Sequence, residues 1–308
     1  MATLARQEKV PTTAPVRRRR EPGASPWAWA WIGPAVILLL AFFIYPLINT
    51  FILSFQNADS TRFVGLKNYI TIFTSPTMLG VLKNNLLWLV LGTILTVGLG
   101  LIVAVLVDKV KIESIIKSAL FIPMAISMVS AGVIWRFVYI YEPPNQPQIG
   151  LLNAILALFH IPPQVWLINQ NINNFALIVV YTWMWTGFCM VILSAALKGI
   201  PDDVVEAAKI DGANRWVMFW QITIPMIGPT LGVVTTTMII NIMKIFDVVY
   251  VMTGGNYNTD VVAQEFWNQL FSFQNYGMAS ALAVILTIAV IPVMYINIRR
   301  MRAEERTR

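Results

Sequence analysis

The sequence predicts an all-α membrane protein with six spanning helices. Composition is the first reason, because 57% of the 308 residues are hydrophobic and 12% are charged, about half the charge of an ordinary globular domain. Long apolar segments are the second, since roughly 20 such residues in a helix cross about 30 Å of hydrocarbon. These segments also lack the strict alternation of membrane β-barrel strands. Helices are therefore the expected spanning elements.

Six apolar segments have the length that a membrane helix requires. They cover approximately residues 29–51, 84–107, 115–137, 175–197, 222–243 and 278–298. The first could be a signal peptide, but its apolar run continues through residues 42–46, beyond the about 7 to 15 residues of a signal core. We expect a disordered basic tail over residues 1–26, a membrane domain over residues 27–300 and a basic tail over residues 301–308.

The positive charges predict the orientation of these spans. Of the 22 Lys and Arg residues, 17 lie in the two tails and in the second and fourth connections. Cytoplasmic flanks collect such residues, so both termini and the fourth connection are predicted to be cytoplasmic. The other five, on or near the opposite side, are Arg62, Lys67, Lys83, Arg136 and Lys244. This asymmetry explains the net charge of +7 better than the alternative, a basic stripe for nucleic acid.

Cysteine and histidine usage excludes several kinds of chemistry. Cys189 is the only cysteine, so no intrachain disulfide or cysteine metal site can form. His160 is the only histidine and ends a short apolar run that we interpret as an interfacial helix of an outer loop. A catalytic triad or a zinc site needs partners that these residues lack. The chain also has no Gly-x-x-x-x-Gly-Lys-Ser/Thr loop for a nucleotide, so we expect neither metal nor cofactor on it.

Prolines and small residues within the spans leave alternatives open. Pro123 in the third span and Pro225 at the start of the fifth could make static kinks or hinges for alternating access. In the second span Gly92, Thr96 and Gly100 are four residues apart, so one helix face can approach a neighbour closely. That neighbour could be another helix of this chain or a partner subunit.

The fourth connection, residues 198–221, predicts a helix-turn-helix along the cytoplasmic membrane surface. Pro201 suits a first helical turn, and Asp202 and Asp203 complement the positive end of the helix. Gly212 can take the left-handed conformation that ends such a helix. Beyond it, aromatic residues resume an apolar face that leads into the fifth span.

This connection resembles the "EAA" loop of ABC importer permeases, in which Pro, Glu-Ala-Ala, Asp-Gly-Ala, an aromatic residue, Ile and Pro occur at set spacings. The matching positions are Pro201, Glu206, Ala207, Ala208, Asp211, Gly212, Ala213, Phe219, Ile222 and Pro225. In that family the loop docks on an ATPase. The resemblance therefore implies docking by Glu206, Ala207, Ala208, Asp211 and Gly212, with Glu206 as a charge partner.

Three outer segments narrow the resemblance to carbohydrate-importer permeases, similar to the membrane subunits of maltose transporters. Residues 63–69, 150–153 and 246–255 look like outer-loop signatures of that class. The usual Gly-Gly-Pro is Gly254-Gly255-Asn256 here, a variant similar to permeases for alpha-glucosides. The first outer loop, about residues 50–83, is too short for the extra domain of some relatives and resembles the plain six-span core.

The resemblance implies a type I ABC importer permease in the inner (cytoplasmic) membrane of a bacterium or archaeon. It is not expected to be an enzyme, because ATP and magnesium would bind to a separate ATPase. The implied partners are a second, homologous permease that forms a heterodimer with it, two cytosolic ATPases and an extracytoplasmic sugar-binding protein.

Polar and aromatic side chains within the spans are candidates for a sugar path. Aromatic faces and amide groups suit the apolar ring face and the hydroxyl groups of a sugar. The candidates are Asn241, Trp185, Tyr181, Thr237, Asn85 and Trp88. Hydrogen bonding between packed helices is the alternative role for such residues. An ion-coupled secondary transporter is the alternative function, although the span centres lack the ionisable residues that such carriers use.

Overall fold

The computed structural model describes residues 26–108 and 110–305. The tail predicted to be disordered over residues 1–26 lies almost entirely outside these residues. Within the described part the chain is helical, with a single isolated β-bridge between Gln56 and Phe63. The chain divides into two compact units, Met1–Ile48 and Asn49–Arg308, which we describe separately.

The first unit contains helix α1 (Pro26–Leu39), the π-helical turn η1 (Leu40–Ile44) and the start of α2 (Tyr45–Leu53). The wide turn η1 directly precedes Pro46 on α2, whose missing N–H disturbs the regular hydrogen-bond ladder. The continuous apolar stretch Ala30–Leu53 has none of its spanning window buried. This stretch confirms the predicted first span.

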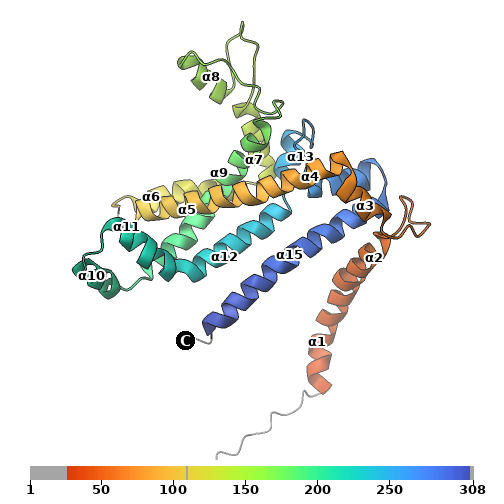
Figure 1. The fold of residues 1–308 in the computed structure, drawn as a ribbon, viewed down its shortest axis with the longest axis horizontal. Helices are drawn as coiled ribbons and strands as arrows, with labels where there is room; N and C mark the ends of the chain where they lie inside the picture. The colour runs from red at the N-terminus through yellow and green to blue at the C-terminus, as the bar shows by residue number, and fades with distance from the viewer. Residues whose placement is uncertain (1–25, 109, 306–308) are drawn as a thin grey trace, which may run out of the picture. The chain divides into compact units, whose positions relative to one another are not determined.

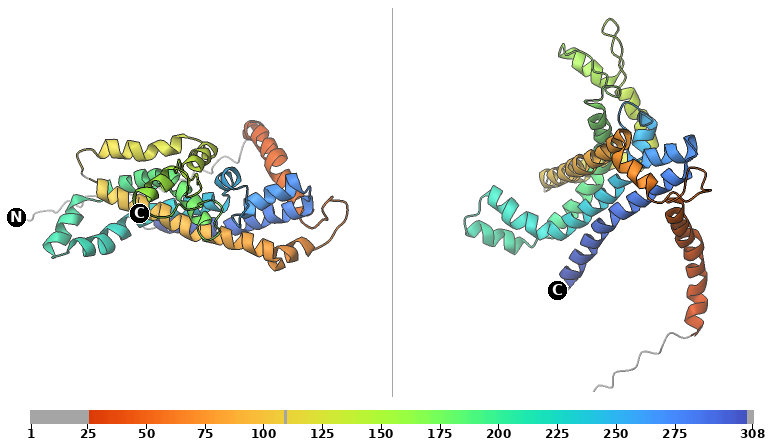
Figure 2. Two further views of the ribbon diagram at one scale, coloured as in Figure 1. Left: turned by 90° about the horizontal axis from the view of Figure 1, so that it is seen from above. Right: turned by 45° about the vertical axis from the view of Figure 1, so that its right-hand side comes forward.

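The second unit holds the other helices (Figures 1 and 2). In chain order they are α3 (Lys67–Thr74), α4 (Pro76–Leu87), η2 (Trp88–Gly92), α5 (Thr93–Val107), α6 (Glu113–Phe121), η3 (Ile122–Ala125), α7 (Met128–Val138), α8 (Leu151–Leu158), α9 (Asn173–Lys198), α10 (Asp202–Ile210), α11 (Arg215–Val217), η4 (Met218–Thr223), α12 (Ile224–Met243), α13 (Asp247–Met252), α14 (Val262–Trp267), η5 (Asn268–Ser272) and α15 (Tyr276–Glu305). Four stretches here are long and apolar enough to cross a membrane: Pro76–Val107, Asn173–Lys198, Arg215–Met243 and Tyr276–Arg299.

The third predicted span is wrong as a single straight helix. Residues 115–137 fall in two helical segments, Glu113–Ala125 and Met128–Val138, that meet at 102°. Pro123 lies in the short 3₁₀ turn η3 that ends the first segment, and Ile126 is extended. Ser127 then starts α7 as its N-cap, its hydroxyl accepting a hydrogen bond from the Ser130 N–H. The described residues thus contain five helices that are long and apolar enough to cross a membrane, or six if the bent pair counts as one span.

Small residues in α5 and α9 let the helices of this unit approach closely. A Cβ atom added at Gly100 would lie 2.5 Å from the Cys189 Cβ atom of α9. One added at Gly92 would lie 3.2 Å from Ile242 of α12, and Gly187 of α9 meets the Leu120 carbonyl of α6. The small face of the second span therefore packs within this chain, which decides between the two alternatives left by the sequence.

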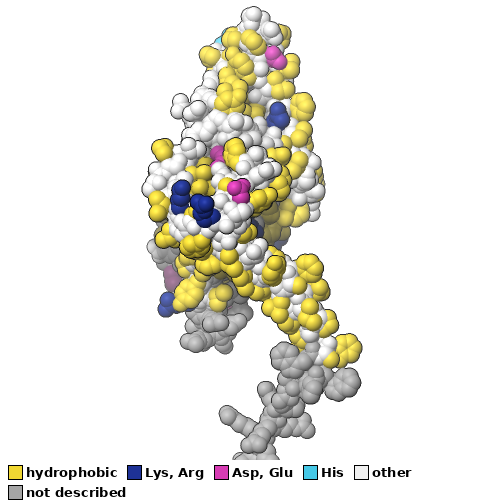
Figure 3. Space-filling view, turned by 90° about the vertical axis from the view of Figure 1, so that its right-hand side faces the viewer, with side chains coloured by type: hydrophobic (Ala, Val, Ile, Leu, Met, Phe, Trp, Pro, Cys, Tyr) yellow, Lys and Arg dark blue, Asp and Glu magenta, His cyan; other side chains and the backbone are white. Residues whose placement is uncertain are grey.

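Apolar side chains also cover much of the outer surface. Figure 3 shows a face on which hydrophobic atoms far outnumber those of Lys, Arg, Asp and Glu. The second half of α15 contributes exposed apolar residues, among them Ile288, Ile291 and Ile296. A surface of this kind suits hydrocarbon rather than water.

Candidate coupling loop and transport path

The fourth connection folds as the predicted helix-turn-helix. Pro201 is the N-cap of α10, with φ −61° and ψ 134°, so it precedes the helix instead of opening its first turn. Asp202 and Asp203 lie in that first turn, and Lys209 lies in the last, so all three charges complement the helix dipole. Figure 1 shows α10 and α11 at the periphery of the bundle.

Gly212 ends α10 in the left-handed conformation, with φ +82°. Its N–H donates to the Lys209 carbonyl at 3.1 Å, and the Ala213 N–H donates to the Ala208 carbonyl at 2.9 Å. Asn214 then caps α11, since its Oδ1 atom accepts a hydrogen bond from the Val217 N–H at 2.9 Å. Backbone carbonyls close one end of the turn and the Asn214 side chain closes the other.

Four of the five predicted docking residues are exposed. Glu206, Ala207, Asp211 and Gly212 face outward, whereas Ala208 is the one buried residue of α10. Ala208 packs against its own chain, and Ala207 is the exposed alanine of the two. Ile210 is 86% exposed, which leaves a large apolar side chain beside the candidate docking residues.

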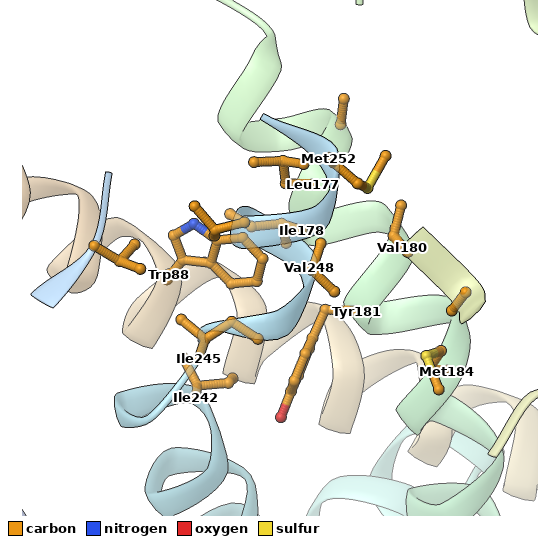
Figure 4. Packing of buried hydrophobic residues seen from close by; sticks show 14 of the residues in the cluster. Trp88, Leu177, Ile178, Val180, Tyr181, Met184, Ile242, Ile245, Val248 and Met252 are labelled. Atoms are coloured by element: carbon orange, nitrogen blue, oxygen red, sulfur yellow. The ribbon is translucent and has the colours of Figure 1, made fainter. Parts of the chain in front are cut away.

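Three of the predicted path residues come together between the spans. Trp88 of η2 and Tyr181 of α9 meet edge to face, with ring centroids 6.0 Å apart, and Trp185 follows Tyr181 at 6.2 Å. Trp88 and Tyr181 are almost fully buried. Figure 4 shows both rings among apolar side chains, with the Tyr181 hydroxyl pointing away from them. These three aromatic residues form the aromatic cluster named below.

The polar atoms of the aromatic cluster are unpartnered. Trp88 Nε1, Tyr181 Oη and Trp185 Nε1 are buried and have no hydrogen-bond partner among the described residues. Buried polar groups are normally paired, because leaving one unpaired costs about 1–3 kcal/mol. The cluster therefore holds three buried polar groups that no described residue satisfies.

The other predicted path residues are placed differently. Asn85 accepts a hydrogen bond from the Val262 N–H at 3.0 Å, and the Thr237 hydroxyl donates to the Val233 carbonyl at 2.9 Å. Asn241 is half-buried on α12, beside Ile242, which packs in the same apolar cluster as Tyr181. Its side chain makes no hydrogen bond to any residue that the structure describes.

Sequence reasoning missed the asparagines that hold the outer loop after α13. Asn84 donates to the carbonyls of Asn258 and Asp260, both at 2.9 Å. From α9, Asn173 donates to the Tyr257 carbonyl at 2.7 Å and Asn174 to the Asn258 carbonyl at 3.1 Å. The signal in the sequence was an asparagine pair at the outer end of each of the two spans.

A buried acid pair follows the same loop. Burial is the largest cause that raises the pKa of Asp260, and the neighbouring Glu265 carboxyl raises it further, to about 8. The Val261 N–H, which donates to Asp260 Oδ1 at 2.9 Å, acts in the opposite direction. Near neutral pH the pair therefore tends to hold a proton.

The structure combines spanning helices, an exposed capped hairpin and an aromatic cluster between the spans. This combination is that of the permease class of membrane transport proteins. The chain belongs to the family of binding-protein-dependent transport system inner membrane components, whose family model matches residues 97–302. It is therefore an integral inner-membrane permease subunit, and the predicted relationship to carbohydrate ABC importer permeases is confirmed.

Several relatives match over nearly the whole chain. The osmoprotective compounds uptake permease protein GgtC of Synechocystis sp. is 56% identical over 90% of this chain and 100% of its own length. The alpha-glucoside transport system permease protein AglF of Rhizobium meliloti is 41% identical over 90% of this chain and 82% of its own.

A solved structure supports the fold. It is a bacterial alginate ABC transporter in complex with an alginate pentasaccharide-bound periplasmic protein. One of its chains matches with a TM-score of 0.74 and 22% identity, over 88% of this chain and 92% of that one. The match confirms the predicted type I importer fold.

Proposed function

We propose that this chain forms part of the translocation path of an ATP-driven importer for a neutral sugar or glycoside. The observation that carries the proposal is the exposed, doubly capped α10 hairpin in a chain that lacks a phosphate-binding loop of its own. Such a chain needs an ATPase from elsewhere and offers a rigid element to receive it. Membership of the family favours this function over an ion-coupled secondary transporter.

Glu206, Ala207, Asp211 and Gly212 would contact the ATPase, and Ala208 would fix the helix that carries them. The full assembly would contain a second permease, two cytosolic ATPases that bind ATP and magnesium, and an extracytoplasmic binding protein. Both termini and the α10 hairpin would be cytoplasmic, as the charge asymmetry predicts. ATP-driven closure of the ATPases would then select the outward-open state of the permease pair.

The aromatic cluster and Asn241 would contact the cargo. The cluster combines aromatic faces with unpartnered hydroxyl and indole N–H groups, and no carboxylate, ammonium or guanidinium group belongs to it. This chemistry suits a neutral polyhydroxylated solute better than a charged or zwitterionic one. Asn85 and Thr237, whose polar atoms bond the backbone, would shape the path, and an alpha-glucoside is the cargo that we propose.

A second cargo class is worth testing because the most similar of the relatives above is named for osmoprotective compounds. Uptake would be measured in proteoliposomes that contain the assembled transporter and its binding protein. The probes are maltose as an alpha-glucoside, cellobiose as a beta-glucoside and glycine betaine as a zwitterionic osmoprotectant. ATP-dependent uptake of maltose alone supports the proposed cargo, whereas uptake of glycine betaine alone contradicts it.

Docking is tested with two variants of equal charge change on α10. Glu206→Lys should abolish copurification of the ATPase and ATP-dependent uptake. Asp203→Lys, also exposed and one turn earlier, should cost the helix only about 0.3–1 kcal/mol and keep both. If Glu206→Lys retains both activities, the docking role is wrong.

A further inference from the structure

A cluster of charged side chains joins α6 to the end of α9. It lies directly before the hairpin of α10 and α11, which we call the coupling hairpin. Lys198, the last residue of α9, has its Nζ atom 2.6 Å from Glu113 Oε1, at the start of α6. Lys117, one turn further along α6, contacts the same Glu113 oxygen and the Ser194 hydroxyl of α9. One carboxylate oxygen thus joins two ammonium groups from two helices. We call Glu113, Lys117, Ser194 and Lys198 the clasp.

The clasp is more than a surface ion pair. The side chains of Glu113 and Lys117 are 18% and 19% exposed, Ser194 is buried, and the side chain of Lys198 is 53% exposed at the open side of the network. Exposed single pairs contribute little, but shared and partly buried networks act as a unit. Neutralising Glu113 would leave two ammonium groups facing each other at the helix junction, so the contact would be lost rather than weakened.

The coupling hairpin has few other attachments to the bundle. An open cavity of about 570 Å³ lies behind it, with Asp108, Glu113, Lys198, Asp202 and Arg215 among its lining residues. Ala208 is the one buried residue of α10. A displacement of α10 can therefore reach the spans by two routes: through the short segment between Lys198 and Asp202 into α9, and through the turn at Gly212 into the continuous helix Arg215–Met243. The clasp lies at the base of the first route.

The clasp also determines which neighbouring helix moves together with α9. Further along the same pair of helices, Gly187 of α9 meets the Leu120 backbone of α6, and Leu120 packs against the apolar cluster that contains Cys189 and Leu193 of α9. Beyond Leu120, α6 continues through η3 into the 102° bend and α7. Apolar packing thus holds the carboxyl end of α6 to α9, and the clasp holds its amino end, so that α6 follows a rotation of α9 along its whole length.

We propose that the clasp makes α6 and α9 one rigid body, so that displacement of the coupling hairpin is passed to the bent α6–α7 segment. Its members are positioning residues for transport, and this inference rests on the proposed function. Without the clasp, the ATPase would still dock and hydrolyse ATP, but the amino end of α6 would no longer follow α9. The expected defect is therefore a lower number of solute molecules imported per ATP.

The test measures that ratio in proteoliposomes containing the assembled transporter. Glu113→Gln and Lys198→Gln should each lower it about five-fold or more, within the usual range of energetic coupling between sites, while ATPase copurification stays normal. Lys111→Gln is the matched control, because Lys111 lines the neighbouring cavity with Glu113 and Lys198 and forms no ion pair with any described residue. It should keep the wild-type ratio.

Exchanging the charges of Glu113 and Lys198 tests whether transport needs the ion pair between them or needs each residue for another reason. The double variant Glu113→Lys/Lys198→Glu restores opposite charges across the junction and should recover most of the ratio. An unchanged ratio in both single variants overturns the proposal, and so does a double variant no better than the singles. Loss of ATPase copurification together with uptake also overturns it, because the clasp would then be structural only. Absence of ATP-dependent uptake by the wild type would instead refute the proposed function.

Discussion

Two glycines of α5 give different predictions for the same substitution. A Cβ atom at Gly100 would lie 2.5 Å from the Cys189 Cβ atom and 3.1 Å from the Met190 backbone nitrogen. A Cβ atom at Gly98 would meet nothing within 4 Å. Both residues lie in the same helix, so Gly98→Ala serves as the matched control for Gly100→Ala.

The expected difference follows from two contributions. Each substitution gains the same helix propensity, about 0.8–1 kcal/mol, which cancels when the two variants are compared. Gly100→Ala also overpacks the contact with α9, and such overpacking typically costs about 1–3 kcal/mol. The Gly100→Ala protein should therefore be less stable than the Gly98→Ala protein by about 1–3 kcal/mol.

Reversible unfolding of the purified chain by titration with a denaturing detergent measures this difference. The double variant Gly100→Ala/Cys189→Gly moves the Cβ atom from one helix to the other and should recover part of the loss. Recovery should be incomplete, because the Met190 nitrogen stays close to the new methyl group. Equal stability of Gly98→Ala and Gly100→Ala would refute the close contact between α5 and α9.

The remaining predictions concern the outer loops and the bend. The folded loop favours protonated Asp260, whose pKa rises from 3.8 to about 8, so its contribution to stability is full below about pH 4 and is lost as the pH rises through about 8. Asp260→Asn provides an amide donor toward Glu265 at every pH, so the protection factors of residues 253–262, from which the intrinsic exchange rate is divided out, should lose their pH dependence; a persistent dependence would assign it elsewhere. Asn153 is fully buried and bonds the Ile140 and Gln164 backbones, so Asn153→Ala should cost about 1–3 kcal/mol per group left unpaired, seen as faster proteolysis of residues 140–168. Ser127→Ala removes the cap of α7 and should cost about 0.5–2 kcal/mol in the same denaturation assay, and an unchanged midpoint would contradict the capping role.

The coupling hairpin could be predicted because its signals are local. Asp202 and Asp203 in the first turn and Gly212 after the last turn act within a few residues of their own position. The spans are predictable for a related reason, since hydrocarbon thickness sets their length whatever they pack against. The prediction placed Pro201 in the first turn of the helix, and the structure places it just before that turn, at the N-cap.

The bend in the third span could not be predicted from proline alone. Pro229 and Pro292 lie inside the continuous helices α12 and α15, because neighbouring groups in a bundle can compensate for the missing donor. Pro123 differs in being followed four residues later by Ser127, which caps a new helix. The proline ends one helix and the serine starts the next, so only the two signals together distinguish a break from a kink.

The outer loop after α13 depends on contacts between residues far apart in the sequence. Asn84 is separated by 174 positions from Asn258, whose carbonyl it contacts, and no local pattern reports such a pairing. The same holds for Asn85, which looked like a path residue and instead accepts the Val262 N–H. An amide within a span predicts a hydrogen bond, but its partner comes from the tertiary fold.

Polar residues whose atoms are paired and polar residues whose atoms are unpaired indicate how a transport path is distinguished from ordinary helix packing. Asn84 and Asn85 have their polar atoms paired with backbone groups, so they stabilise the bundle. Trp88 follows them in the same span and Tyr181 lies in α9, and both have buried polar atoms that no described residue satisfies. In a core that serves stability alone, such atoms would be hydrogen-bonded or absent, because each buried polar atom left unpaired costs about 1–3 kcal/mol of stability. Their retention is explained if a ligand supplies the missing partners, and removal of the Tyr181 hydroxyl by Tyr181→Phe should then weaken uptake while stability is kept or improved.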